Sequence, residues 1–99
     1  MDKQTIIKKL QEIKPIYQKE GIEIIGLFGS YAKDNATQES DIDIVYGLDY
    51  EQFSKKYHDG FSKILRLDEI KKDLEKMFQK KIDLIPNKNP KLFKEIIYV

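Results

Sequence analysis

Apolar residues in the first part of the chain recur at the spacing of a helix. They are separated by three or four residues: Ile6, Leu10, Ile13 and Tyr17. This spacing predicts an amphipathic helix from Asp2 to about Gln18, with Asp2 as its N-cap and Gly21 after its end. Pro15 is expected to kink this helix or to end it early. Packing against a core is the only role that we assign to it.

Three shorter apolar runs have the length and the β-branched content of strands. They cover residues 22–28, 41–46 and 81–85. Gly47 is expected to close the second run, and Pro86 is expected to stop the third.

Residues 49–66 combine aromatic and aliphatic side chains at helical spacing. The members of this stripe are Tyr50, Phe53, Tyr57, Phe61, Ile64 and Leu65. They predict one or two short helices, interrupted by a turn at Asp59-Gly60. We interpret the stripe as core packing and keep a partner-binding surface as the alternative. His58, the only histidine, is interpreted as a surface residue beside the turn.

Residues 67–79 predict a further helix. Its apolar face consists of Ile70, Leu74, Met77 and Phe78. Asn89 followed by Pro90 indicates the start of a last short helix, and we expect this apolar chain end to fold back on the sheet. The pattern predicts one α/β (α+β) domain over residues 1–99, with a small mixed sheet of about three strands flanked by helices.

Composition supports a folded domain and excludes several classes of protein. Hydrophobic residues make up 40% of the 99 residues and charged residues 35%, which argues against disorder. Lys and Arg number 18 against 17 Asp and Glu, so the net charge of +1 gives no reason to expect nucleic-acid binding. The lack of cysteine excludes disulfides and thiolate metal sites. No apolar run suits a membrane span and no signal-peptide pattern is present, so we expect a cytoplasmic protein.

Two acidic residues stand at the start of the second predicted strand. Because alternate residues of a strand share a face, the side chains of Asp41 and Asp43 point the same way. Neighbouring carboxylates repel one another unless a positive charge lies between them. Oxygen ligands of this kind favour a hard cation, Mg²⁺ or Mn²⁺.

Gly29 and Ser30 follow the first predicted strand and suit an anion. A glycine lets backbone approach a ligand closely, and a helix beginning at Ser30 would present free N–H groups and a hydroxyl to a phosphate. A phosphate site facing a carboxylate pair indicates metal-assisted phosphoryl or nucleotidyl transfer.

Asp83 is an ionisable residue inside the third apolar run. A carboxylate there costs free energy unless a charge or a metal compensates it. A strand-edge aspartate that merely caps a loop is the alternative interpretation, and we favour it less. Pairing of the third strand with the second would place Asp83 close to Asp41 and Asp43.

The ordered combination of these motifs resembles the signature of the DNA polymerase beta-type nucleotidyltransferases. Its two halves are residues 29–32, Gly-Ser-Tyr-Ala, and residues 40–43, Ser-Asp-Ile-Asp. The short chain is similar to the minimal nucleotidyltransferases, which are often antitoxin partners of HEPN-domain toxins. Where that family usually has arginine and glycine, this chain has Lys33 and Asp34. Lys33 keeps the positive charge of arginine but lacks its planar guanidinium group. Asp34 tolerates the positive φ that we expect at this position.

The resemblance implies a nucleotidyltransferase fold and the transfer of AMP from ATP to a tyrosine of the partner toxin. It implies two Mg²⁺ ions, with Mn²⁺ as a substitute, and a proton-accepting role for the late aspartate. The catalytic residues and metal ligands that it implies are Asp41, Asp43 and Asp83. The phosphate-binding residues that it implies are Gly29, Ser30 and Lys33.

Two alternatives stay open. In the first, the negative charge of Asp34 near the triphosphate marks a catalytically weak or inactive antitoxin that neutralises its toxin by binding alone. In the second, the acceptor is a small molecule, such as an antibiotic hydroxyl; enzymes of that kind that resemble this signature usually carry an extra helical domain. Magnesium-dependent ATP binding separates the first alternative from an enzyme.

Overall fold

The first helix forms where the apolar spacing predicts it. The computed structural model describes residues 2–88 and 94–99. Helix α1 spans Lys3–Gln18, and the Asp2 side chain caps it by accepting a hydrogen bond from the Thr5 backbone N–H at 2.8 Å. Every residue of the expected apolar face is buried. Pro15 lies inside the helix, which continues past it to Gln18, so of the two effects expected of Pro15 the early end is wrong.

The strands form one mixed sheet in the order β3-β2-β1-β4. Their bounds are Ile22–Phe28 for β1, Ile42–Leu48 for β2, Ile82–Pro86 for β3 and Ile97–Tyr98 for β4. Strand β2 is antiparallel to β1 and parallel to β3, and β4 is antiparallel to β1. The expected mixed sheet is confirmed, with β4 as an additional strand. Gly47 does not end β2, and Pro86 is the last residue of the edge strand β3, where a missing N–H is tolerated.

An extra residue in β1 shifts its pairing with β2. The register changes by one position between Ile24 and Gly26, so Ile25 is a bulge. Beyond the bulge, Phe28 lies opposite Asp43. The end of β1 therefore meets the start of β2 at the point where the two sequence motifs lie.

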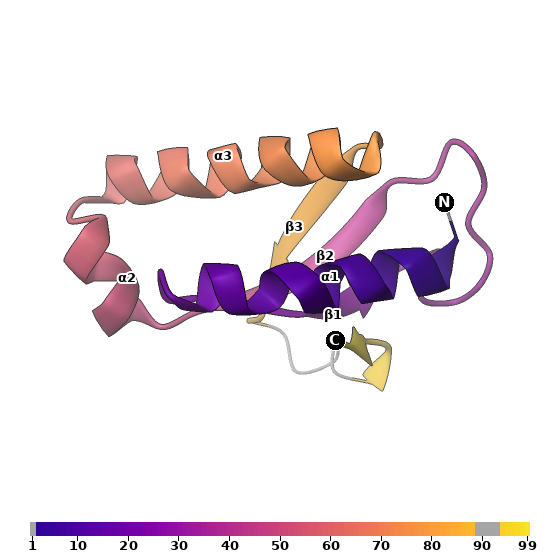
Figure 1. The fold of residues 1–99 in the computed structure, drawn as a ribbon, viewed down its shortest axis with the longest axis horizontal. Helices are drawn as coiled ribbons and strands as arrows, with labels where there is room; N and C mark the ends of the chain where they lie inside the picture. Colours follow the sequence, from indigo (N-terminus) through magenta and orange to yellow (C-terminus); the bar gives the residue numbers. More distant parts are fainter. Residues whose placement is uncertain (1, 89–93) are drawn as a thin grey trace.

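Helices α1 and α3 cover one face of the sheet, and α2 lies at one end of both (Figure 1). The large core lies under these helices and includes Ile6, Leu10, Ile24, Leu27, Ile70 and Leu74. A smaller cluster, which includes the bulge residue, has as its buried members Ile25, Val45 and Ile96. Because side chains alternate along a strand, Asp43 and Val45 share the face away from the core residues Ile42 and Ile44.

Helix α2 spans Tyr50–Lys56 and α3 spans Gly60–Phe78. Asp59 begins α3 with a capping box, in which its side chain accepts from the Ser62 backbone N–H at 2.7 Å. The expected turn before α3 is confirmed. A separate helix beginning at Leu67 is wrong, because α3 is continuous from its cap onward. Within the described residues, no helix has both the length and the apolar content that a membrane span needs.

The aromatic stripe of residues 50–65 divides between core and surface. Phe53 is fully buried and packs on the ring of Tyr57, with centroids 5.0 Å apart. Four other members are exposed: Tyr50 by 61%, Phe61 by 72%, Ile64 by 67% and Leu65 by 46%. Core packing as an interpretation is therefore wrong for these four. His58 is exposed, as expected.

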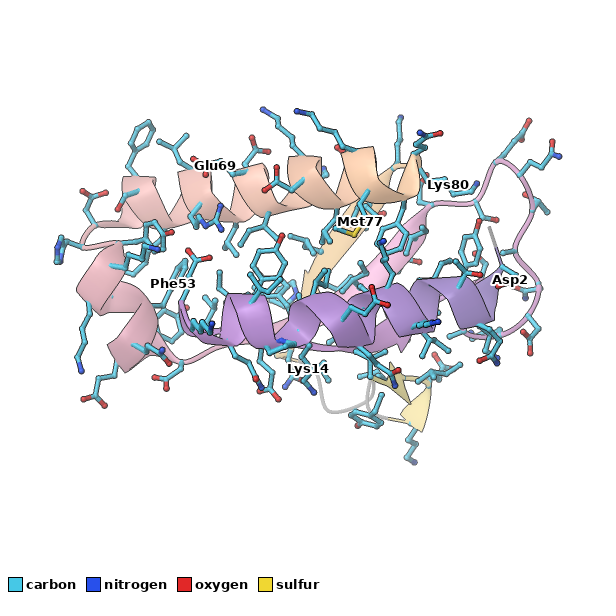
Figure 2. All side chains as sticks on the ribbon, in the orientation of Figure 1. Asp2, Lys14, Phe53, Glu69, Met77 and Lys80 are labelled. Atoms are coloured by element: carbon cyan, nitrogen blue, oxygen red, sulfur yellow. The ribbon has the colours of Figure 1, made fainter. Side chains whose placement is uncertain are left out.

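The last described residues return to the sheet, as expected. Strand β4 pairs with β1 at Gly26, where an added Cβ would collide with the backbone of Ile97. Lys14 of α1 donates a hydrogen bond to the carbonyl oxygen of Val99 at 2.8 Å (Figure 2 labels the lysine). The expected last helix begins on residues 89–93, which lie outside the described residues.

A largely buried ion pair connects the end of α1 to the first half of α3. Glu20, just after α1, is 9% exposed, and Arg66 of α3 donates to its two carboxylate oxygens at 2.9 and 2.7 Å. Tyr57, just after α2, donates its hydroxyl to the same carboxylate. The hydrogen bonds from Arg66 are the main reason that the pKa of Glu20 falls to about 2.

Candidate functional site

Asp43 and Asp83 are direct register partners on the parallel strands β2 and β3. Their neighbours Ile42 and Ile82 are buried in the core under the helices, so the two carboxylates lie on the opposite face of the sheet. Asp41 precedes β2 by one residue, and alternation places it on the same face as Asp43. The expectation that strand pairing brings Asp83 beside Asp43 is confirmed.

Negative charge converges on the Asp43 carboxyl. Its pKa is raised first by burial, then by the charge of Asp83, and to a smaller extent by that of Asp41. Asp43 is half-buried, whereas Asp41 and Asp83 are exposed to solvent. A cation bound at this point would relieve the repulsion, because it attracts the ionised form of each carboxyl.

Gly29 brings the turn after β1 against Asp43. It has a φ of 76°, and a Cβ added there would collide with the Asp43 carboxylate. Two hydrogen bonds close the turns of residues 29–35. The Lys33 N–H donates to the Gly29 carbonyl and the Asn35 N–H donates to the Ser30 carbonyl, each at 3.0 Å. These residues form turns rather than a helix beginning at Ser30. An anion here would therefore meet the N–H groups of a turn instead of a helix terminus.

Lys33 and Asp34 both form ion pairs. Asp34 has a φ of 60°, the conformation expected of a residue that replaces glycine. Its carboxylate pairs with Lys3 of α1 at 3.1 Å, and Lys33 pairs with Glu95 at 3.6 Å. The negative charge of Asp34 is thus partly compensated within the chain, and the charge of Lys33 is shared with Glu95.

Lys80 holds the loop before Asp41, a contact that no sequence pattern indicates. Its ammonium group donates to the carbonyl oxygens of Gln38 at 2.8 Å and Ser40 at 3.4 Å, and lies 5.8 Å from the Tyr31 ring centroid. Figure 2 shows Lys80 near the end of α3. The lysine therefore links this end of α3 to both halves of the motif.

The carboxylates fit a hard divalent cation if a substrate completes its coordination. Over residues 2–88 and 94–99, no group of three or more acidic, His or Cys side chains is arranged to hold a metal ion. Asp43 and Asp83 still offer oxygen ligands side by side. Mg²⁺ commonly binds one or two carboxylates and completes its shell with water and substrate phosphates. The pair therefore suits an ion that arrives with a phosphate-bearing ligand.

We expect Gly29→Ala to lower the free energy of unfolding by roughly 1–3 kcal/mol. Alanine is strained at a φ of 76°, and its Cβ must displace the Asp43 carboxylate. Urea unfolding measures the loss. Gly60→Ala is the matched control, because a Cβ there meets nothing within 4 Å and Gly60 lies in the first turn of α3. Equal stability of the two variants would contradict the close approach of Gly29 to Asp43.

Comparison with known proteins finds relatives over most of the chain. Residues 11–98 match the family model described as polymerase beta, nucleotidyltransferase. A Methanocaldococcus jannaschii protein, named as a candidate protein adenylyltransferase, is 39% identical over 91% of this chain and 93% of its own length. Protein adenylyltransferase MntA of Thermococcus cleftensis is 26% identical over 94% of this chain and 95% of its own. A solved structure of a candidate minimal nucleotidyltransferase shares the fold, with a TM-score of 0.72 and 19% identity over 100% of this chain and 97% of that one.

Proposed function

This chain belongs to the polymerase beta nucleotidyltransferase family, and we propose that it transfers AMP from ATP to a hydroxyl of a partner protein in a metal-dependent reaction. Nucleotidyl transfer itself follows from the family match over residues 11–98. Relatives that are named protein adenylyltransferases support ATP as the donor and a protein as the acceptor. We treat residues 1–99 as one nucleotidyltransferase domain, since β4 near the chain end pairs with β1.

The observation that carries this proposal is the register pair of Asp43 and Asp83, with Gly29 against the first of them. Asp41 and Asp43 would hold the metal together with the triphosphate, and Asp83 would complete the site. The turn from Gly29 to Ser30 would bind the β- and γ-phosphates through N–H groups and the serine hydroxyl. Lys33, at the far end of the turn, would add positive charge.

The proposed reaction forms one bond and breaks one. The acceptor hydroxyl oxygen bonds to the α-phosphorus of ATP, the bond from this phosphorus to the bridging oxygen breaks, and pyrophosphate leaves. Asp83 accepts the proton of the hydroxyl, and the exposure of its side chain leaves room for an acceptor to approach. Two Mg²⁺ ions, or Mn²⁺, would supply charge neutralisation for the triphosphate and for the leaving group when bound.

The acceptor that we propose is a HEPN-type toxin, modified on a tyrosine and thereby silenced. The signature motifs support this partner, because the minimal nucleotidyltransferases that they resemble often serve as antitoxins. The ion pair of Asp34 with Lys3 supports catalysis over neutralisation by contact alone, because it compensates the extra negative charge near the phosphate-binding turn. The acceptor is expected to present its tyrosine at the exposed side of Asp83.

The product of the neighbouring open reading frame should become labelled by ATP carrying label on the α-phosphate, and not by ATP labelled on the γ-phosphate. Labelling should require Mg²⁺ and stop when the metal is chelated. Mass spectrometry of the co-expressed partner should find one added AMP on a tyrosine. A partner that binds this chain tightly and stays unmodified would instead support an antitoxin that acts by contact alone.

A further inference from the structure

The first turns of α3 carry an apolar surface that the core does not use. The buried residues of α3 all lie in its second half: Ile70, Leu74 and Phe78. In the first half, Phe61 is 72% exposed, Ile64 67% and Leu65 46%. Figure 1 shows these turns extending past the end of β3, beyond the strands that the second half covers. Contiguous apolar side chains that are exposed together are a feature of interaction sites.

A groove of about 550 Å³ lies beside this surface, between the start of α3 and the ends of β2 and β3. Its apolar lining includes Ile25, Tyr46, Leu48, Tyr50, Ile64 and Leu67. Ile64 belongs both to the groove and to the exposed surface, whereas Phe61 and Leu65 lie outside the groove. The groove and the exposed turns are therefore continuous.

The polar groups of the groove favour an acidic ligand that also donates hydrogen bonds. Lys63 and Lys88 line the groove together with one acidic residue, Glu23. Neither lysine takes part in an ion pair with any residue that the structure describes. The buried side-chain oxygen of Asn87 likewise has no hydrogen-bond donor among those residues. An N–H or O–H of a ligand would satisfy this oxygen, whose desolvation is otherwise unfavourable.

The groove lies at the ends of the two strands that carry the carboxylate pair, and its lining comes from both faces of the sheet. Leu48 and Leu67 pack against the core under the helices, whereas Gly47 lies on the carboxylate face. Gly47 follows Asp43 on β2, and Asn87 follows Asp83 after β3, in each case by four positions. Even spacing keeps them on the same face, and the separation along a strand is about 13 Å. A protein bound in the groove can therefore place a side chain a few residues away at the carboxylates.

We infer that the groove and the first turns of α3 are the docking surface for the acceptor protein, which binds through an apolar segment with acidic side chains. This inference rests on the proposed function, and it names where the acceptor is recognised. A small ligand confined to the groove would leave Phe61 and Leu65 in water, so it does not account for the exposed turns. A protein segment covers both, and its acidic groups complement the two lysines.

Ile64→Glu should weaken binding of the acceptor by about tenfold or more, because it places a charge in the apolar contact. The acceptor probe is the product of the neighbouring open reading frame. Its KM should rise by that factor, while the KM for ATP and kcat at saturating acceptor stay unchanged. Calorimetry without ATP should show the same loss of affinity. Ile16→Glu is the matched control, since Ile16 is 58% exposed on α1 and lies outside the groove.

The outcomes separate this docking surface from the proposed reaction. If Ile64→Glu loses affinity for the acceptor but the wild type transfers no AMP to it, the docking surface is supported and the proposed reaction is overturned. Transfer with unchanged acceptor KM in Ile64→Glu would keep the reaction and overturn the surface. No binding of the probe by the wild type would also overturn it. Self-association of the wild type that Ile64→Glu abolishes, with acceptor binding unchanged, would assign the surface to a second copy of the chain instead.

Discussion

Asp43→Asn is expected to lower nucleotide transfer by roughly 10³-fold or more and to leave the variant folded. Asp43 is the half-buried member of the carboxylate cluster, and it contacts both the motif glycine and its register partner Asp83. Asparagine keeps the shape of the side chain but removes the charge that would hold Mg²⁺. Transfer of α-labelled phosphate at saturating ATP and acceptor measures the loss.

Thermal unfolding of Asp43→Asn distinguishes a site effect from a folding defect. Because burial and neighbouring carboxylates raise the pKa of Asp43, its charge is unfavourable in the metal-free fold. The variant should therefore unfold at the same temperature as the wild type or above it when no metal is present. Asp34→Asn is the control. Asparagine also tolerates positive φ, and Asp34 is an exposed carboxylate that is not part of the cluster of Asp41, Asp43 and Asp83. Wild-type activity in Asp43→Asn would remove the proposed role of this carboxyl.

Glu20→Gln should lower the free energy of unfolding by about 3 kcal/mol, because it leaves the guanidinium of Arg66 without its main partner in a site that is mostly closed to water. The Arg66 side chain is only 17% exposed and that of Glu20 only 11%. Chemical denaturation measures the change. Glu69→Gln removes the other carboxylate on Arg66, at 3.1 Å and 65% exposed, and should change stability by less than about 1 kcal/mol. Similar decreases in the free energy of unfolding of both variants would contradict the assignment of Glu20 as the main partner of Arg66.

The same carboxylate predicts how stability depends on pH. Folding lowers the pKa of Glu20 from 4.5 to about 2, chiefly through its hydrogen bonds with Arg66. The stabilisation is therefore complete above pH 4.5 and is lost as the pH falls towards 2. Glu20→Gln should be less sensitive to acid over this interval than the wild type. Parallel decreases in both proteins would assign the acid sensitivity to other groups.

Local patterns predicted the elements that bury one face. The spacing of Ile6 and Leu10 identified α1, and the alternation around Asp43 identified which side of β2 faces the core. The pairing of Asp43 with Asp83 was predictable as well, because it requires only that two apolar strands lie side by side. Helical spacing alone, by contrast, could not separate buried Phe53 from exposed Phe61, since exposure depends on where the sheet ends beneath the helices.

Contacts between distant parts of the chain could not be predicted from the sequence, because they also depend on how the elements pack together. Glu20 and Arg66 are 46 positions apart, and each is an ordinary charged residue in its own segment. Lys80 reaches Gln38 over 42 positions to hold the loop before the carboxylates. Only the packing of α1, α3 and the sheet brings these groups together. The candidate acids of the site had a local signature, whereas the residues that hold their loops in place had none.

The bulge at Ile25 makes the length of β1 as important as its composition. If Ile25 paired regularly with β2 instead of forming a bulge, the register before it would continue, and Asp43 would face Leu27 instead of Phe28. Gly29 would then lie one position further along β1 from the partner of Asp43, and the side chains of β1 after residue 25 would point to the opposite face of the sheet. Hydrophobic substitutions in β1 should thus be tolerated more readily than the gain or loss of a single codon between the bulge and Gly29. Relatives with loops of different length after Ser30 are easier to reconcile with this geometry than relatives with a longer or shorter first strand.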